Sequence, residues 1–384
     1  MRVSTCAVIL LAAGAMAARP FLDEPDTGIT DVLVDLPKGQ LPDLDDMVAL
    51  NDFQYAARNY LPAANYTYYR SGAGGEWSYR NNLEVYNRYR FKPRTVVDIT
   101  SISNSMNTTV LGYNISSPLF ISPCARAGYG HPDAELNIVR GAAANNVIYV
   151  VSGFSTLPLK QISAAADPGQ ILFSQIYFGN NDTYNTEQIR LAEAAGAKAI
   201  VWAVDSPGSP SRQRSARYGV GSANTVFLSN SWDRYHSLQA QTKLPLVLKG
   251  IMTAADARTA IRQGVKAIIL SNHGGRNLDG SPSSLEVALE IYQTDPSVFK
   301  QTEVLADGGI RYGTDALRLL SLGVKAVGVG RPVMFSNVFG EEGVTKALSI
   351  IKNEIMNDAA NLGVANIKKI DASYVQWTPN NWYS

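Results

Sequence analysis

The segment ILSNHGGRNLDG, residues 269–280, leads from an apolar run into a histidine, two glycines and an arginine. A loop that only turns the chain needs Gly, Asn or Asp. It does not need an imidazole and a guanidinium three residues apart. A positioned histidine can act as a base, and the planar fork of an arginine matches a carboxylate. His273 and Arg276 therefore predict a site that binds an acid and takes a proton, although a lone histidine is more commonly a core residue.

Two glycine-rich segments further along the chain each carry an arginine. They are ADGGIR, which ends in Arg311, and GVGRP, which contains Arg331. Glycine allows backbone N–H groups to approach a ligand closely, and arginine adds charge-assisted hydrogen bonds to a phosphate. One Gly-Gly pair would indicate only a tight turn. Two successive glycine turns, each with an arginine, predict a phosphate site.

The elements that must position these residues alternate regularly between about residues 119 and 353. Val- and Ile-rich runs such as VIYVV, KAIVWAVD and VKAIILSNHGG alternate with helical stretches such as TAADARTAIRQG. Continuous apolar strands between helices are typical of a parallel sheet that is covered on both faces. Eight such units predict an α/β fold, a closed (β/α)8 TIM barrel, in preference to an open doubly wound sheet.

In a barrel of this kind the residues that follow the strands converge at one mouth. Asp205 ends the fourth predicted strand and would orient His273 and stabilise its cation. Lys249 ends the fifth and would place a fixed cation beside a ligand, or else be a surface lysine. The other polar or glycine-rich strand ends are Pro123, Cys124, Ala125, Ser152, Gln175, Tyr177, Ser271, Asp307, Gly308, Gly309 and Gly330.

The remaining parts of the chain fall into three segments. Residues 1–18 contain one arginine, an apolar run of about ten residues and Ala-Met-Ala, which predicts a secretory signal peptide, since a membrane anchor needs ~20 residues. Residues 19–118 are predicted to be a helical segment that caps one end of the barrel, which takes up residues 119–384. The stretch 206–232 is too long for an ordinary loop, so we expect a functional lid or disorder.

The composition limits the partners and the compartment. A net charge of +1 argues against nucleic acid or an anionic membrane as the main partner, and we predict no metal site. Removal of the signal peptide eliminates Cys6 and leaves Cys124, so the mature monomer would have no disulfide. Four Asn-x-Ser/Thr sequences fit glycosylation of a secreted protein, at Asn65, Asn107, Asn114 and Asn181.

Several segments resemble the FMN-dependent α-hydroxy-acid oxidases and dehydrogenases, the family that includes glycolate oxidase and lactate oxidase. The segments are YYRSGA, LVLKGI, SNHGGRNLDG, LADGGIRYGTDALRLLSLG and VGVGRPVMFS. The resemblance extends over most of the chain, from about Phe53 to Phe339, and the pairing of SNHGGR with the Asp-Gly-Gly-Ile-Arg segment is highly specific. It implies FMN as the cofactor and oxidation of an (S)-2-hydroxy acid to a 2-oxo acid.

The resemblance also implies a role for each matching residue. His273 would be the base and Asp205 its partner, Tyr177 would bond the substrate hydroxyl, and Lys249 would lie near flavin N1 and O2. The substrate residues would be Arg276, Arg212 and Tyr68, which hold the carboxylate, together with the pocket aromatic Phe154. The residues implied to bind FMN are Pro123, Cys124, Ala125, Ser152, Gln175, Lys249, Ser271, Asp307, Gly308, Gly309, Arg311, Gly330 and Arg331.

Two segments depart from the family pattern. The family has Thr-Ala-Met after the proline of the first strand, where this chain has Cys124-Ala125-Arg126. The long loop has Ser209 in place of a bulky apolar residue and a single Arg212 before Gln213 in place of paired arginines. These departures keep a second interpretation open, an FMN-dependent oxidase that tailors an alcohol or ring of a larger secondary metabolite. A third is an FMN-binding barrel without redox turnover, which His273 and Arg276 argue against.

Two further expectations concern the electron acceptor and the oligomeric state. Oxygen is the expected acceptor, giving hydrogen peroxide, because the compartment is extracellular and no cytochrome domain precedes the barrel. The sequence does not separate hydride transfer from a carbanion route. Members of the family often form tetramers, so a homo-oligomer is possible here unless surface glycans prevent it.

Overall fold

The computed structural model describes residues 26–221 and 227–379. The predicted signal peptide and Cys6 lie outside these residues. Eight parallel strands close into a barrel in the order β10-β11-β4-β5-β6-β7-β8-β9. They are β4 (Leu119–Ile121), β5 (Ile148–Val151), β6 (Leu172–Ile176), β7 (Ala199–Ala203), β8 (Leu246–Ile251), β9 (Ala267–Leu270), β10 (Glu303–Asp307) and β11 (Ala326–Val329). The predicted (β/α)8 barrel is confirmed.

The apolar runs become strands because nearly every strand residue is buried on one side or the other of the barrel wall. One set of side chains fills the interior, including Phe120, Val150, Val201 and Ile269. The alternate set faces the surrounding helices, as Ile121, Val151 and Leu270 do. A strand that is covered on both faces needs apolar residues at every position, which accounts for the continuous Val- and Ile-rich runs.

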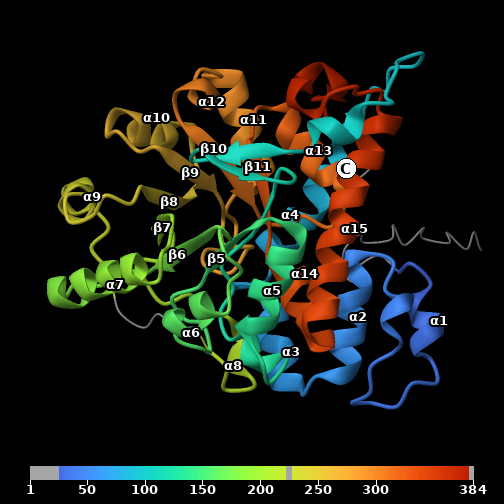
Figure 1. Ribbon diagram of the computed structural model, residues 1–384, viewed down its shortest axis with the longest axis horizontal. Helices are drawn as coiled ribbons and strands as arrows, with labels where there is room; N and C mark the ends of the chain where they lie inside the picture. The colour runs from blue at the N-terminus through green and yellow to red at the C-terminus, as the bar shows by residue number, and fades with distance from the viewer. Residues whose placement is uncertain (1–25, 222–226, 380–384) are drawn as a thin grey trace, which may run out of the picture.

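Helices surround the barrel and return the chain from the end of one strand to the start of the next (Figure 1). The helix after β11 is split into a short α14 at the barrel mouth and a long α15 that packs against α5 and α13. The helices between and after the strands are α5 (Glu135–Asn145), α6 (Leu159–Ala164), α7 (Asp182–Ala194), α8 (Gln213–Ala216), α9 (Trp232–Gln239), α10 (Ala254–Arg262), α11 (Ser284–Thr294), α12 (Val298–Gln301), α13 (Gly313–Ser321), α14 (Arg331–Ser336) and α15 (Gly340–Asn361).

The residues before the barrel contact both of its ends, whereas the sequence predicted a cap at one end. The hairpin of β2 (Thr108–Val110) and β3 (Tyr113–Ile115) inserts Val110 and Ile115 into the interior beneath the strands. Leu111 N there donates to the Glu303 carboxylate at the start of β10. The chain must pass beneath the barrel before β4 begins, so the apolar hairpin closes that end.

The helices of the same segment lie elsewhere on the barrel. They are α1 (Ile29–Leu33), α2 (Leu50–Tyr60), α3 (Ala63–Arg70) and α4 (Trp77–Glu84). α2 packs against α14, and Tyr68 and Tyr69 of α3 reach the mouth. The short strand β1 (Arg90–Phe91) pairs antiparallel with β12 (Val375–Gln376) near the end of the described chain. The N-terminal segment therefore takes part in building the mouth where the site lies.

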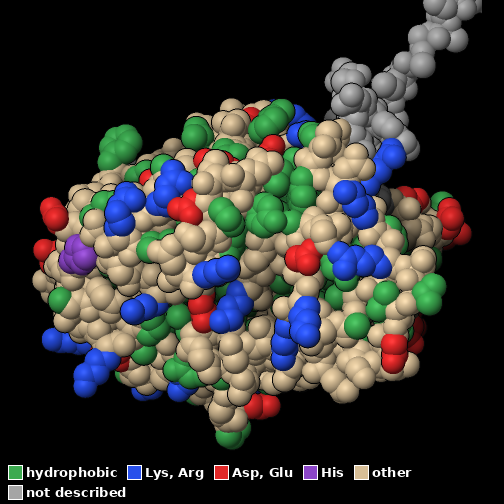
Figure 2. All heavy atoms as spheres, turned by 90° about the horizontal axis from the view of Figure 1, so that it is seen from above, with side chains coloured by type: hydrophobic (Ala, Val, Ile, Leu, Met, Phe, Trp, Pro, Cys, Tyr) green, Lys and Arg blue, Asp and Glu red, His purple; other side chains and the backbone are tan. Residues whose placement is uncertain are grey.

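The molecular surface is mixed in charge on the face drawn in Figure 2, and the helices are not of the membrane-spanning kind in the described residues. Lysines and arginines are mixed with acidic and neutral side chains on the face drawn in Figure 2. In the part of the chain that the structure describes, no helix combines the length and the apolar composition that a membrane crossing requires.

Candidate active site

The turn after β9 explains the two glycines of the SNHGGR segment. His273, Gly274 and Gly275 have φ values of 61°, 64° and 72°, which are all left-handed. Glycine adopts this conformation readily, and other L-residues pay for it with steric strain. A Cβ on Gly275 would also lie 2.5 Å from the backbone N of Tyr79. His273 is the strained member of the turn, as is common for functional residues, and its imidazole points into the mouth.

His273 lies between an acid and a phenol. Its Nδ1 is 3.1 Å from Oδ1 of Asp205, and its Nε2 is 3.2 Å from the hydroxyl oxygen of Tyr177. The carboxylate of Asp205 can only accept, so it fixes the proton on Nδ1 and leaves the lone pair of Nε2 toward the cavity. The Asp205 side chain is 1% exposed and that of His273 17% exposed.

The electrostatics of this pair suit a proton acceptor. Burial lowers the pKa of His273 and outweighs the opposite effect of the Asp205 charge. Burial raises the pKa of Asp205, but attraction by His273, their hydrogen bond and Lys249 together lower the pKa below its usual value. Burial raises the pKa of Tyr177, which stays protonated as a donor. The resting site therefore holds a neutral imidazole beside an ionised carboxylate.

Asp205 reaches this position because of an irregularity in β8. The register between β8 and β9 shifts at residues 249–251, around Gly250. Gly250 has a φ of 109°, and a Cβ there would lie 2.4 Å from Cβ of Asp205. Glycine is the residue that fits both the backbone angle and the space. The bulge therefore makes room for the carboxylate that orients the histidine.

Lys249 is a buried cation with acidic and hydroxyl partners. Its Nζ donates to Ser271 Oγ at 3.0 Å and lies 3.4 Å from Oδ2 of Asp307. Ser271 Oγ in turn donates to Asp307 at 2.5 Å and accepts from the backbone N of His273 at 3.0 Å. Burial lowers the pKa of Lys249, but the two nearby carboxylates Asp307 and Asp205 outweigh it and the pKa is raised. Lys249 is therefore a fixed ammonium, and not a surface lysine.

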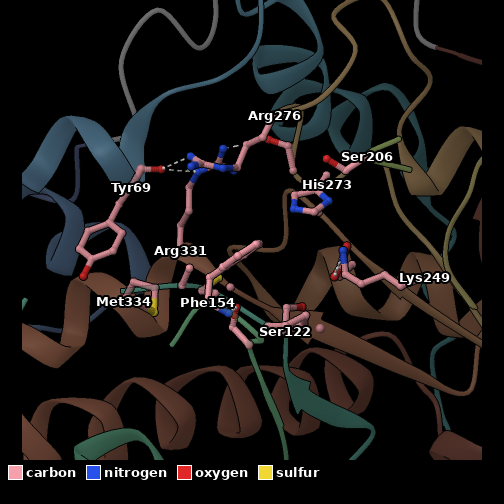
Figure 3. Close-up of a pocket in the computed structure, with 18 of the residues that line it drawn as sticks. Tyr69, Ser122, Phe154, Ser206, Lys249, His273, Arg276, Arg331 and Met334 are labelled. Atoms are coloured by element: carbon pink, nitrogen blue, oxygen red, sulfur yellow. Dashed lines mark hydrogen bonds and ion pairs between the residues drawn. The ribbon is translucent and has the colours of Figure 1, made fainter. Parts of the chain in front are cut away.

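Two arginines lie side by side on the opposite wall (Figure 3). Nη1 of Arg276 donates to the carbonyl oxygens of Tyr68, Tyr69 and Ser71 at 3.0, 3.2 and 2.9 Å. Arg331 donates to Tyr69 O and Ser71 O at 2.9 and 3.2 Å. Neutral carbonyls hold the two guanidinium groups in place without cancelling their charge, so the charge remains available to an anionic ligand.

The loop between β7 and α9 brings a third arginine to the same wall. Nε of Arg212 donates to the Arg276 carbonyl at 2.8 Å, and its Nη2 donates to Oδ1 of Asn277 at 3.1 Å. Burial and the charge of Arg276 lower the pKa of Arg212 to about 9, so this side chain is still protonated at neutral pH. The single arginine of the loop is thus placed beside the predicted carboxylate clamp.

Aromatic side chains form the walls near the base. The Phe154 ring stacks on Tyr177 with 5.1 Å between centroids. The centre of the Tyr68 ring lies 5.5 Å from the guanidinium carbon of Arg276 and 5.4 Å from that of Arg126. Arg126, the departure noted in the first strand, donates to the Tyr129 hydroxyl at 2.5 Å and does not line the cavity. Arg126 therefore contacts the ring of a lining residue without lining the cavity itself.

These side chains line one cavity of about 1000 Å³ that opens to solvent. The predicted residues that line it are Tyr68, Pro123, Cys124, Ala125, Ser152, Phe154, Tyr177, Arg212, Lys249, His273, Arg276, Asp307, Gly308, Gly309, Arg311, Gly330 and Arg331. The other three, Gln175, Asp205 and Ser271, are not among the lining residues. Asp205 bonds the base and Ser271 bonds Lys249.

Sequence reasoning missed several lining residues, namely Tyr69, Ser122, Ser206, Gly274, Ile310, Gly328 and Met334. Ser122 precedes a predicted strand-end residue, and Ser206 and Ile310 each follow one, so including one position on either side would have found them. Tyr69 and Met334 belong to α3 and α14. Their place in the cavity depends on how these helices pack, which no local pattern indicates.

The cavity suits a flavin phosphate because its lining is positively charged and because buried donors near it lack acceptors in the described part of the chain. Five cationic side chains line it, Arg212, Lys249, Arg276, Arg311 and Arg331, against the single carboxylate of Asp307. Among the described residues, none accepts from the buried Nη2 of Arg311 or the buried Nε2 of Gln175. Buried donors nearly always have partners in complete sites. These two therefore indicate a ligand with acceptor groups.

The glycine turns fit the same ligand by shape. A Cβ on Gly309 would lie 1.9 Å from the carbonyl oxygen of Asn82, and one on Gly330 would lie 3.1 Å from Sγ of Cys124. Gly308 and Gly309 have left-handed φ values of 106° and 84°. The close approach of Asn82 and the left-handed backbone therefore require glycine at position 309, and the turn presents backbone without side chains to the cavity. No group of three or more potential metal ligands is found in the described part of the chain.

The fold and the site together define a (β/α)8-barrel enzyme with an oriented histidine base and an anion-binding mouth. The chain belongs to the FMN-dependent dehydrogenase family, which it matches over residues 57–230 and 221–377. FMN is therefore its cofactor, and the protein is an oxidoreductase. The resemblance inferred from SNHGGR and the glycine turns is confirmed at the level of the family.

Curated relatives match the chain over most of its length. A peroxisomal (S)-2-hydroxyacid oxidase of Arabidopsis thaliana is 34% identical over 87% of this chain and 97% of its own length. Glycolate oxidase of Spinacia oleracea is 33% identical over 86% of this chain and 96% of its own length. L-lactate dehydrogenase (cytochrome) of Wickerhamomyces anomalus is 32% identical over 86% of this chain and 61% of its own length.

Two solved enzyme structures are also similar to this chain in fold and in sequence. A flavocytochrome b2 variant with pyruvate bound has a TM-score of 0.83 at 32% identity, covering 91% of this chain and 89% of that one. A mandelate oxidase with 3,3-difluoro-2-hydroxy-3-phenylpropionic acid has a TM-score of 0.78 at 32% identity, covering 86% of this chain and 98% of that one.

Proposed function

We propose that this protein uses FMN to oxidise (S)-2-hydroxy acids to 2-oxo acids, with oxygen as the electron acceptor and hydrogen peroxide as the co-product. The observation that carries the proposal is the convergence of an oriented neutral imidazole, His273, and two guanidinium groups, Arg276 and Arg212, on one cavity. A base beside a carboxylate clamp matches a substrate whose reacting carbon bears both a hydroxyl and a carboxylate.

The arginines and Tyr177 would fix the substrate before the reaction. The planar fork of Arg276 can bond both oxygens of a carboxylate, and Arg212 adds a second charge from the loop. The hydroxyl of Tyr177 lies 3.2 Å from the base, so a substrate hydroxyl near one is also near the other. Holding reacting groups in this way lowers the entropic part of the barrel enzyme's activation barrier.

His273 would take the proton at Nε2, and Asp205 would stabilise the imidazolium that forms. When bound, FMN supplies the acceptor for the two electrons of the oxidised carbon. The proton taken by His273 is that of the hydroxyl if the Cα hydrogen leaves as hydride, and that of Cα if a carbanion forms. Lys249, held as an ammonium between Ser271 and Asp307, would balance negative charge that develops nearby.

Oxygen as the acceptor is supported by the oxidases among the relatives. The (S)-2-hydroxyacid oxidase of Arabidopsis thaliana and the glycolate oxidase of Spinacia oleracea are 34% and 33% identical to this chain.

Secretion is the second part of the proposal. It is supported by the signal-like composition of residues 1–18 and by the exposure of three of the four glycosylation sequences, at Asn107, Asn114 and Asn181. Cys124 is a free cysteine in the wall of the cavity, so a mature chain without a disulfide would depend on its core for stability.

One spectroscopic experiment tests the reaction. Glycolate, L-lactate and L-mandelate are added in turn to the purified holoenzyme without oxygen, and flavin absorbance near 450 nm is followed. Bleaching by at least one acid, reversed by air with release of hydrogen peroxide, is expected. If neutral alcohols bleach the flavin and the acids do not, the enzyme belongs to the metabolite-tailoring alternative instead.

A further inference from the structure

An ion pair between the half-exposed Arg214 and the buried Glu76 joins the β7–α9 loop to the start of α4. Nε of Arg214 donates to Oε1 of Glu76 at 2.8 Å, and Nη2 donates to Oε2 at 2.7 Å, so the ion pair is bidentate. We call this arrangement the Arg214 fork. Gly72 N donates to Oε1 at 2.9 Å, and Arg70 Nη1 lies 3.4 Å from Oε2. Glu76 is 7% exposed. Each oxygen of this carboxylate is therefore engaged by at least two donors.

Glu76 stays charged over the working pH range and is held in an unusual conformation. Burial raises its pKa, but the Arg214 hydrogen bonds, Gly72 N and Arg70 outweigh burial and lower the pKa to about 2. Its φ is 61°, in the left-handed region that a glutamate rarely adopts. Such a conformation persists where surrounding contacts determine it, and the Arg214 fork is the strongest contact of the side chain.

Two further contacts join the same two segments. Gly74 N donates to Ser211 O at 2.9 Å, and Ser215 Oγ donates to Ser71 Oγ at 2.5 Å. Because Arg214 lies within the same five residues, the loop is fastened to residues 71–76 at three successive points.

Residues 71–76 are at the same time part of the mouth. The Ser71 carbonyl accepts from Nη1 of Arg276 at 2.9 Å and from Nη2 of Arg331 at 3.2 Å. The segment therefore lies between the arginines of the cavity and residues 211–215 of the loop. Arg212, two residues before Arg214, extends to the Arg276 carbonyl and lines the cavity, while Arg214 and Glu76 do not.

We propose that the Arg214–Glu76 pair is a latch that closes residues 211–215 over the cavity and positions Arg212 against the substrate carboxylate. Both members are positioning residues, since neither touches the cavity. The proposal rests on the proposed function, in which Arg212 binds the carboxylate. In this proposal, an ion pair outside the cavity helps the enzyme to select substrates that have a carboxylate.

The first test compares two arginine substitutions in the loop. Arg214→Gln removes the fork, and Arg217→Gln removes an equal charge three residues on, where the side chain is exposed. Anaerobic stopped-flow reduction gives the substrate Kd and the limiting rate. We expect Arg214→Gln to raise Kd about 10-fold, the size of one charge-assisted hydrogen bond, with FMN content unchanged. Equal Kd values for the two variants would overturn the latch.

The second test asks whether the latch acts through Arg212. In an Arg212→Met background, Arg214→Gln should change Kd less than about twofold, because the group it positions is gone. Arg214→Lys keeps the charge without the fork and should fall between wild type and Arg214→Gln. A full 10-fold effect in the Arg212→Met background would show a general structural role and overturn the proposal.

The third test does not depend on turnover. Hydrogen exchange of the holoenzyme should show faster exchange at residues 211–216 in Arg214→Gln and in Glu76→Gln than in Arg217→Gln. Unchanged exchange would overturn the latch even if Kd rises. If wild type exchanges as expected but no 2-hydroxy acid reduces its flavin, the proposed function fails and the latch is judged on exchange alone.

Discussion

Nδ1 of His273 lies 3.1 Å from a carboxylate oxygen of Asp205, which is 68 positions earlier in the chain. The contact exists because the β9 turn places the histidine in a left-handed conformation and because Gly250 leaves space behind the carboxylate. The pair fixes one tautomer of the imidazole and directs Nε2 to the cavity. The first two predictions depend on this relationship.

Replacing His273 with Ala should leave FMN bound and slow flavin reduction by substrate about 10²–10⁴-fold, the usual contribution of a positioned base. Anaerobic stopped-flow measurement of the reduction rate checks this, with the absorbance ratio of protein to flavin as the control for FMN content. A variant that reduces its flavin within a few-fold of wild type would refute the role of His273.

Replacing Asp205 with Asn should move the acid limb of the pH profile. Burial holds the pKa of His273 below 6.5 and the Asp205 charge partly raises it, so removal of the charge lowers that pKa further. The base is active when neutral, so kcat/KM of wild type falls as pH drops through this pKa, and in the variant it falls only at a lower pH. The plateau also falls, because a less basic imidazole takes the proton less readily. An acid limb that stays at the same pH or moves to higher pH in the variant contradicts the pairing of Asp205 with His273.

Replacing Arg276 with Lys keeps the charge and loses the fork that matches a carboxylate. We expect kcat/KM for the hydroxy acid to fall about 10- to 100-fold, the range of one hydrogen bond to a charged group. Steady-state kinetics of the acid and of its methyl ester measure the difference, and the ester should be a poor substrate of wild type. Comparable turnover of acid and ester, with a silent Arg276→Lys, would argue for a neutral substrate.

Arg311 and Arg331 should contribute to FMN binding through the phosphate. Replacing either with Ala should weaken FMN more than riboflavin, because riboflavin has no phosphate for the guanidinium to bond. Fluorescence titration of the apoprotein with both flavins gives the two Kd values. In wild type the Kd of riboflavin should exceed that of FMN, and we expect the ratio of riboflavin Kd to FMN Kd to fall about tenfold or more in each variant. The same loss for both flavins would indicate a damaged cavity instead of a lost phosphate contact.

The four glycosylation sequences should not be equivalent in the secreted protein. Nδ2 of Asn65 donates to the Tyr129 carbonyl at 3.0 Å and is half-buried, so a sugar on that atom would break the bond. Asn107 and Asn181 use only their Oδ1 atoms, toward Lys368 and Tyr184 N, and Asn114 is exposed. Release of glycans in heavy-oxygen water followed by mass spectrometry should mark Asn107, Asn114 and Asn181 and leave Asn65 unmarked. A marked Asn65 contradicts this assignment.

The sequence determined the barrel and most of its mouth. Strands buried on both faces must be apolar throughout, so the runs that end in Asp205, Lys249 and Asp307 could be recognised locally. Parallel strands then bring their carboxyl ends to one side, which places polar strand-end residues in one cavity without further information. The left-handed Gly274 and Gly275 follow from the same local pattern.

Tertiary structure alone decided which of these residues face the ligand and which support them. Asp205 and Ser271 occupy strand ends like the others, but they lie outside the cavity lining, where Asp205 bonds the base and Ser271 bonds Lys249. The hairpin below the barrel and the Arg214–Glu76 latch join residues that lie far apart in the chain, 138 positions in the second case. Such contacts depend on how separate elements pack, and periodicity and spacing within one segment contain no record of that packing.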